Sequence, residues 1–147
     1  MQNPSQLPPG QLRRLCRDGG FDGPTSGYSA GYVQANMVIL PSADAEDFAD
    51  YCDRNPKPCP VLEILSPGDS EPKMTAPGAD VRTDLPRYRV FQGGALIAEP
   101  TGIQDIWRDD LVTFLLGCSF TVEEALLGAG LPLYHIEETG FVPWFAT

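Results

Sequence analysis

Two aspartates and an arginine alternate along one short segment, Asp80-Val81-Arg82-Thr83-Asp84. Alternate side chains of an extended backbone share a face, so we expect Asp80, Arg82 and Asp84 to lie together. Two carboxylates beside a guanidinium can differ widely in pKa, so one can be an ionised base and the other a protonated acid, while Arg82 binds a substrate carboxylate through two hydrogen bonds. These three residues are the predicted catalytic group. The alternative is a salt-bridge network that only fixes a loop.

Other polar residues are candidates for substrate binding. Gln34 and Asn36 fall on one face of a predicted strand, where they either bond each other or offer amides to a polar ligand. Arg54 and Lys57 follow a predicted helix, whose dipole favours cations at its end, so binding competes there with a structural role. Arg87, shortly after the 80–84 segment, is a further candidate.

Nucleophilic and metal chemistry are less favoured. Ser119, near the start of a predicted helix, is a candidate nucleophile or anion ligand. A serine or cysteine triad needs a nearby base, and the single histidine, His135, falls in a predicted strand. His135 and Glu137 alone are too few ligands for a catalytic zinc ion, so no metal site is predicted.

The elements that must position these side chains alternate along the chain. Hydrophobic periodicity, prolines and glycines predict helices at 11–16, 45–52, 103–117 and 121–128, strands at 32–40, 61–65 and 133–137, and a hairpin at 87–99. The helix at 103–117 rests on apolar residues at helical spacing, and Thr121 with Glu124 matches a capping box. The Pro-, Gly- and Asp-rich segment 66–86 is predicted to be an ordered loop. The expected fold is a mixed α/β sheet with helices packed on it.

Composition narrows the class of partner. The chain has 147 residues, 20 acidic and 10 basic, with a formal charge of -10, which disfavours binding to nucleic acid. The spacing of the four cysteines fits neither a zinc knuckle nor a small disulfide framework, so we expect reduced thiols. The sequence shows no signal peptide and no apolar run long enough for a bilayer, so a cytoplasmic protein without a membrane partner is expected. The oligomeric state, a homo-oligomer included, is left open.

Several motifs occur in the order typical of one family. They are Gly23-Pro24-Thr25-Ser26-Gly27, Gly31-Tyr32-Val33-Gln34-Ala35-Asn36, Arg54-Asn55-Pro56-Lys57-Pro58-Cys59-Pro60, the segment from Ala76 to Tyr88, Trp107-Arg108-Asp109-Asp110 and Leu116-Gly117-Cys118-Ser119-Phe120. Together they resemble the hydro-lyase family that includes D-glutamate cyclase, over residues 20–143. The family continues beyond the motif at Val142-Pro143, so the chain resembles its N-terminal half. The resemblance implies part of a larger, two-part α/β enzyme.

The resemblance also implies a reaction class, the loss of water from a small amino or hydroxy acid. D-glutamate cyclase closes free D-glutamate to 5-oxo-D-proline by attack of the amine on the γ-carboxyl carbon. This step needs a cation for the α-carboxylate, a base for the ammonium, an acid for the departing hydroxide and donors for the oxyanion, but no redox cofactor. We expect residues 1–20 to form a flexible arm with a short helix and residues 21–147 to form a hydro-lyase-like domain. Whether this domain is truncated at its C-terminus is left open. The alternative is a non-catalytic module that binds small acids, or an inactive fragment.

Overall fold

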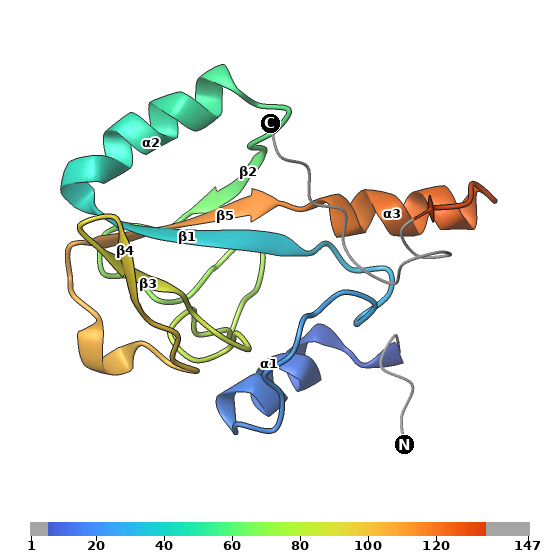
Figure 1. Cartoon of the computed structure of the whole chain (residues 1–147), viewed down its shortest axis with the longest axis horizontal. Helices are drawn as coiled ribbons and strands as arrows, with labels where there is room; N and C mark the ends of the chain where they lie inside the picture. The colour runs from blue at the N-terminus through green and yellow to red at the C-terminus, as the bar shows by residue number, and fades with distance from the viewer. Residues whose placement is uncertain (1–5, 135–147) are drawn as a thin grey trace.

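The computed structural model describes residues 6–134, which fold into three α-helices, a short 3-10 helix and two antiparallel sheets (Figure 1). The α-helices are α1 (Pro9–Arg17), α2 (Ser42–Arg54) and α3 (Ser119–Gly128). The strands are β1 (Ala35–Pro41), β2 (Val61–Ile64), β3 (Val90–Gln92), β4 (Ala95–Ala98) and β5 (Leu111–Gly117), and the 3-10 helix η2 spans Gln104–Ile106. The expected α/β class with helices packed on sheet is confirmed.

The larger sheet has the order β1-β5-β2, with β5 in the centre. β5 is antiparallel to both neighbours, and its pairing with β1 runs from Ala35 opposite Gly117 to Pro41 opposite Leu111. The smaller sheet is the β3-β4 hairpin, turned by Gly93 and Gly94 as the sequence predicts. β5 is the last of these three strands in the sequence, and it therefore pairs with two strands that lie far from it along the chain.

The predicted helix at 103–117 is wrong, because only its first part is helical. η2 takes up three residues, and β5 takes up the apolar run that follows. Residues 112–116 are all buried, since β5 is covered on both faces and flanked on both edges. A short continuous apolar run is typical of such a strand, and it also satisfies helical spacing, so periodicity alone chose the wrong element.

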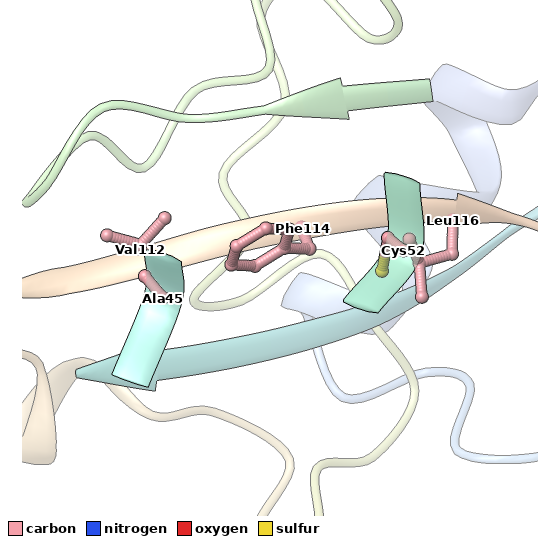
Figure 2. Close-up of a cluster of buried hydrophobic side chains, with 5 residues drawn as sticks. All are labelled: Ala45, Cys52, Val112, Phe114 and Leu116. Atoms are coloured by element: carbon pink, nitrogen blue, oxygen red, sulfur yellow. The ribbon is translucent and has the colours of Figure 1, made fainter. Parts of the chain in front are cut away.

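The main core lies between α2 and β5. Ala45 and Cys52 of α2 pack on Val112, Phe114 and Leu116, which alternate along one face of β5 (Figure 2). The ring of Phe48 meets that of Phe114 edge to face, with centroids 5.0 Å apart. α2 therefore covers one face of the sheet, and α1 lies on the other side of it (Figure 1).

The remaining predicted elements agree with the structure except at their ends. The helices near residues 11–16 and 45–52 and the strand near 61–65 are confirmed as α1, α2 and β2, and the strand predicted at 32–40 begins three residues later. The capping box is wrong, because α3 begins at Ser119 after Cys118, and the hydroxyl of Thr121 instead accepts a hydrogen bond from the amide of Gln34 at 3.1 Å. Most of the strand predicted at 133–137 lies outside the described residues. No described helix has the length and apolar character needed to cross a membrane.

The segment 66–86 has no regular secondary structure, and carboxylate side chains hold it in place through hydrogen bonds. It is therefore an ordered loop, as predicted. Glu63 accepts hydrogen bonds from the amides of Met74 and Thr75, at 3.1 and 2.8 Å, and from the hydroxyl of Thr75 at 2.7 Å. Glu71 accepts one from the amide of Gly78 at 2.7 Å. These bonds satisfy backbone donors that no strand or helix pairs, and they fix the loop before it enters the 80–84 segment.

Candidate functional site

The 80–84 segment is a tight turn and not the extended backbone that the sequence predicted. The amides of Thr83 and Asp84 both donate to the carbonyl of Asp80, at 3.1 and 3.0 Å. The three charged side chains are still brought together in space, but they form two separate ion pairs. Arg82 does not lie between the two aspartates as a shared partner.

Asp80 and Arg82 form one pair within the turn. Arg82 donates from Nε to Oδ1 at 2.9 Å and from Nη2 to Oδ2 at 2.8 Å, and its amide also donates to Oδ1. The guanidinium lies 5.9 Å from the ring centroid of Trp107, whose indole N–H donates to the carbonyl of Gly68. Arg82 therefore already makes with Asp80 the pair of hydrogen bonds that we expected it to make with a substrate carboxylate.

Asp84 pairs with Arg17 of α1, which lies 67 residues earlier in the chain. Arg17 donates from Nε to Oδ1 and from Nη2 to Oδ2, both at 2.7 Å. The Asp84 side chain is 2% exposed, whereas that of Arg17 is 44% exposed. Asp84 also accepts hydrogen bonds from the hydroxyl of Thr83 at 2.8 Å and from the amide of Asp80 at 2.9 Å.

The electrostatics keep both carboxylates ionised. The guanidinium of Arg82 lowers the pKa of Asp80, mainly through its hydrogen bonds. Burial raises the pKa of Asp84, but hydrogen bonds from Arg17, the Asp80 amide and Thr83 together outweigh it, so the pKa is lowered overall. The predicted division into a protonated acid and an ionised base is therefore wrong for this pair, because each carboxylate has its own cation.

A cavity of about 300 Å³ lies where α1 meets the loop and the turn. It is lined by Gly10, Arg13, Arg14, Arg17, Pro77, Gly78 and Asp84. Of the three predicted catalytic residues, only Asp84 faces this space. A small organic acid could occupy it, with arginines on one wall and Asp84 on another.

The α1 arginines are site residues that the sequence analysis missed. Arg13, Arg14 and Arg17 fall within five residues of a chain with only ten basic side chains. Positions 13 and 17 are one helical turn apart and so lie on the same side of the helix. The cationic side of this helix was the sequence signal that could have pointed to a binding site. Nothing in the sequence, however, indicates that this side of the helix contacts residue 84.

The predicted amide pair does not form. Gln34 donates from Nε2 to the carbonyls of Thr25 and Tyr28, at 3.2 and 3.3 Å, and accepts a bond from the hydroxyl of Thr25 at 2.9 Å. It therefore holds the glycine-rich loop against β1 and is not joined to Asn36, which is exposed on the strand. Neither residue lines the cavity.

The remaining binding candidates lie apart from the cavity as well. Arg54 and Lys57 are exposed at the end of α2, on the other side of the sheet from α1, and Arg54 pairs with Asp50 at 3.7 Å (Figure 1). Arg87 is exposed and pairs with Asp22 at 3.0 Å. Ser119 is the exposed first residue of α3. Within residues 6–134 no three His, Cys, Asp or Glu residues are grouped closely enough to hold a metal ion.

Comparisons with known proteins find one family signature and several similar proteins. The sequence signature of the family described as D-glutamate cyclase matches residues 112–147. Proteins named "Putative hydro-lyase" are similar over almost the whole chain. One from Thermoanaerobacter sp. strain X514 is 52% identical over 145 residues, which cover 99% of this chain and 55% of that protein. One from Rubrobacter xylanophilus is 55% identical over 137 residues, which cover 93% of this chain and 53% of that protein.

A third such protein, from Stutzerimonas stutzeri, is 51% identical over 141 residues, covering 96% of this chain and 53% of that protein. The chain therefore spans about half the length of the curated relatives it matches. The likeness is close over that half and extends through the segments that form the turn, the sheet and α1. By these matches the chain resembles the proteins named as hydro-lyases over about half of their length, and its residues 112–147 match the family described as D-glutamate cyclase.

Proposed function

We propose that the chain acts as a hydro-lyase on a small amino or hydroxy acid, and that the specific reaction is the cyclisation of D-glutamate to 5-oxo-D-proline and water. The observation that carries the proposal is the cavity beside the 80–84 turn, which places three guanidinium groups and one buried carboxylate around a space of about 300 Å³. Such a lining suits a ligand that carries carboxylates and an ammonium.

The residues at the cavity would have separate roles. Arg17 gives Nε and Nη2 to Asp84, which leaves Nη1 to donate to a substrate carboxylate. Asp84 is ionised and its oxygens already accept four hydrogen bonds, so its role would be to hold Arg17 in position and to attract the ammonium of an amino acid substrate by its charge. The nitrogen attacks the γ-carbon once the ammonium has lost a proton, and the oxygen that leaves this carbon takes up the two protons that nitrogen releases and departs as water. Nearby guanidinium groups would stabilise the oxyanion that forms between these steps.

Asp80 and Arg82 act as positioning residues in this proposal. Their ion pair closes the turn, and the amide of Asp80 donates to Asp84. The pair therefore holds the carboxylate of Asp84 without facing the cavity itself. Loss of Arg82 would lower turnover by moving Asp84, and we expect Arg82→Lys, which keeps the charge, to restore part of it.

A turnover assay tests the proposal. The chain is incubated with D-glutamate, L-glutamate and a panel of small hydroxy acids, and products that have lost water are measured by mass spectrometry. We expect 5-oxo-D-proline from D-glutamate, and a loss of at least about tenfold in kcat/KM for Asp84→Asn. The matched control is Asp22→Asn, which removes an exposed aspartate from an ion pair away from the cavity.

Two results would contradict the proposal. One is the absence of water loss from every acid while the folded chain still binds them, which would favour the non-catalytic binding module. The other is equal turnover by the Asp84→Asn variant and the unchanged chain. Circular dichroism on each variant separates loss of activity from loss of fold.

A further inference from the structure

Most of the positive side chains of this acidic protein form ion pairs with neighbouring carboxylates. Seven of its ten Lys and Arg residues form ion pairs with Asp or Glu, at Arg17, Arg54, Lys73, Arg82, Arg87, Arg89 and Arg108. Within the part of the chain that the structure describes, the three without an ion pair are Arg13, Arg14 and Lys57. Two of these three line the same cavity.

This placement concentrates positive charge in one spot. Around the cavity, three guanidinium groups face one carboxylate, and that carboxylate is already bonded to Arg17. Two positive charges are left uncompensated there, in a protein whose formal net charge is -10. Arg13 and Arg17 lie four positions apart on one helix, where like charges repel each other, so the arrangement costs stability unless an anion occupies the space.

The helix sets how the two free guanidinium groups are spaced. Neighbouring residues project about 100° apart around a helix axis, so Arg13 and Arg14 approach the cavity from different directions. Arg17 follows one turn later and is held in place by two bonds of 2.7 Å to Asp84. The wall therefore has one fixed guanidinium and two that are free to bind, which fits two separated anionic groups better than one.

We propose that Arg13 and Arg14 are the charge-specificity determinants of this site, and that they make it select acids with two carboxylates over acids with one. The proposal rests on the proposed function, because it concerns the same cavity. It assigns a role to residues outside the turn that carries Asp84. Each of the two arginines would bond one carboxylate, and both would strengthen the field that attracts a doubly charged ligand.

The test is a binding measurement that does not depend on turnover. The chain is titrated by calorimetry with glutarate, with pentanoate and with inorganic phosphate, at one pH and one ionic strength. Glutarate and pentanoate have five carbons each and differ in one carboxylate, and neither has an amine to cyclise. The variants are Arg13→Gln and Arg14→Gln, and the control is Arg89→Gln, which removes the same charge from the β3-β4 hairpin side of the molecule.

We expect glutarate to bind at least about tenfold more tightly than pentanoate. Each of Arg13→Gln and Arg14→Gln should weaken glutarate binding about tenfold and leave pentanoate binding within about threefold, whereas Arg89→Gln should change neither by more than about twofold. Equal affinities for glutarate and pentanoate would overturn the proposal, as would glutarate binding that both variants retain. Binding of phosphate without glutarate would also overturn it, by showing a site for a single compact anion.

The outcome is separable from that of the turnover assay. Turnover of D-glutamate with no effect of Arg13→Gln and Arg14→Gln on binding would leave the proposed function standing and remove this inference. Tight and selective glutarate binding without any turnover would leave this inference standing and remove the proposed function. Both variants alter exposed or half-buried side chains of α1 that bond no other described residue, so the fold should be unaffected.

Discussion

Two buried threonines differ in whether their hydroxyl groups find a partner. The hydroxyl of Thr83 donates to Asp84 at 2.8 Å, whereas that of Thr113, which is buried on the central strand β5, has no hydrogen-bond partner among residues 6–134. A buried polar group without a partner costs stability, and valine has nearly the same shape as threonine. The same substitution should therefore have opposite signs at the two positions.

We predict that Thr113→Val raises the free energy of unfolding by about 1 kcal/mol, and that Thr83→Val lowers it by about 1–2 kcal/mol. Urea denaturation followed by circular dichroism measures both. Destabilisation by Thr113→Val would mean that its hydroxyl has a partner in solution.

The pair of Arg17 and Asp84 is the contact that joins α1 to the turn. Removal of Arg17 would leave a carboxylate that is 2% exposed without its cation. Because the Arg17 side chain is itself 44% exposed, water would replace part of the lost interaction. We predict that Arg17→Ala lowers the free energy of unfolding by about 1–3 kcal/mol, measured in urea. Arg89→Ala, from an exposed pair, should change it by less than about 0.5 kcal/mol, and equal losses in the two variants would contradict the assigned role of Arg17.

At the scale of elements, the close approach of the loop to the chain before β5 depends on one glycine. Gly68 has φ +80°, and a Cβ there would lie 3.1 Å from the carbonyl oxygen of Asp109. Gly94, in the hairpin turn, also has φ +80° but no atom within 4 Å of such a Cβ. The two positions therefore share the backbone strain and differ in the steric clash.

We predict that Gly94→Ala costs about 1 kcal/mol of stability, and that Gly68→Ala costs about 1–3 kcal/mol more. Thermal unfolding of the two variants, scanned under the same conditions, gives the comparison. Equal melting temperatures would show that the loop can move away from Asp109 at no cost.

Local signals were enough to predict most elements but not β5. Gly93 and Gly94 between two alternating segments define a hairpin, and the prolines after Arg54 end α2. For residues 111–117 the local pattern fits helix and strand equally, and the choice is made by β1 and β2, which pair with this segment from distant parts of the sequence. Only the pairing with β1 and β2 decides between helix and strand for this segment.

At the scale of the whole molecule, ionised carboxylates hold the loop and the turn together. The pKa of Glu63 is lowered, since hydrogen bonds from Thr75 and the amides of residues 73–75 outweigh the effect of burial, and those of Asp80 and Asp84 are lowered as well. A carboxylate whose pKa is lower in the folded state adds stability above its unfolded pKa and loses it as the pH falls through the folded value.

We predict a melting temperature that is nearly constant from pH 7 to about pH 5 and falls steeply below about pH 4. The Asp84→Asn variant should start from a lower melting temperature and show a shallower fall, because one of the linked protons is gone. A pH profile with the same slope in both proteins would contradict the role of Asp84 in acid stability.

Only part of the site could be predicted, because some of the contacts that form it are local in the sequence and others are not. The grouping of Asp80, Arg82 and Asp84 follows from their closeness in sequence, whatever the backbone does between them. The ion pair of Asp84 does not, since its partner is Arg17 on α1. The cavity exists only where α1 packs against residues 77–84, so no pattern within either segment could reveal it.

The central claim is that a small acid binds in the cavity between α1 and the turn. The most direct measurement is a titration of the isotope-labelled chain with glutarate, followed by the shifts of its backbone amide signals in NMR spectra. We predict saturable shifts concentrated at residues 10–17 and 77–84. Shifts concentrated instead around Tyr32, Val33 and Thr121, which line a second cavity, or no saturable shifts at all, would contradict the account.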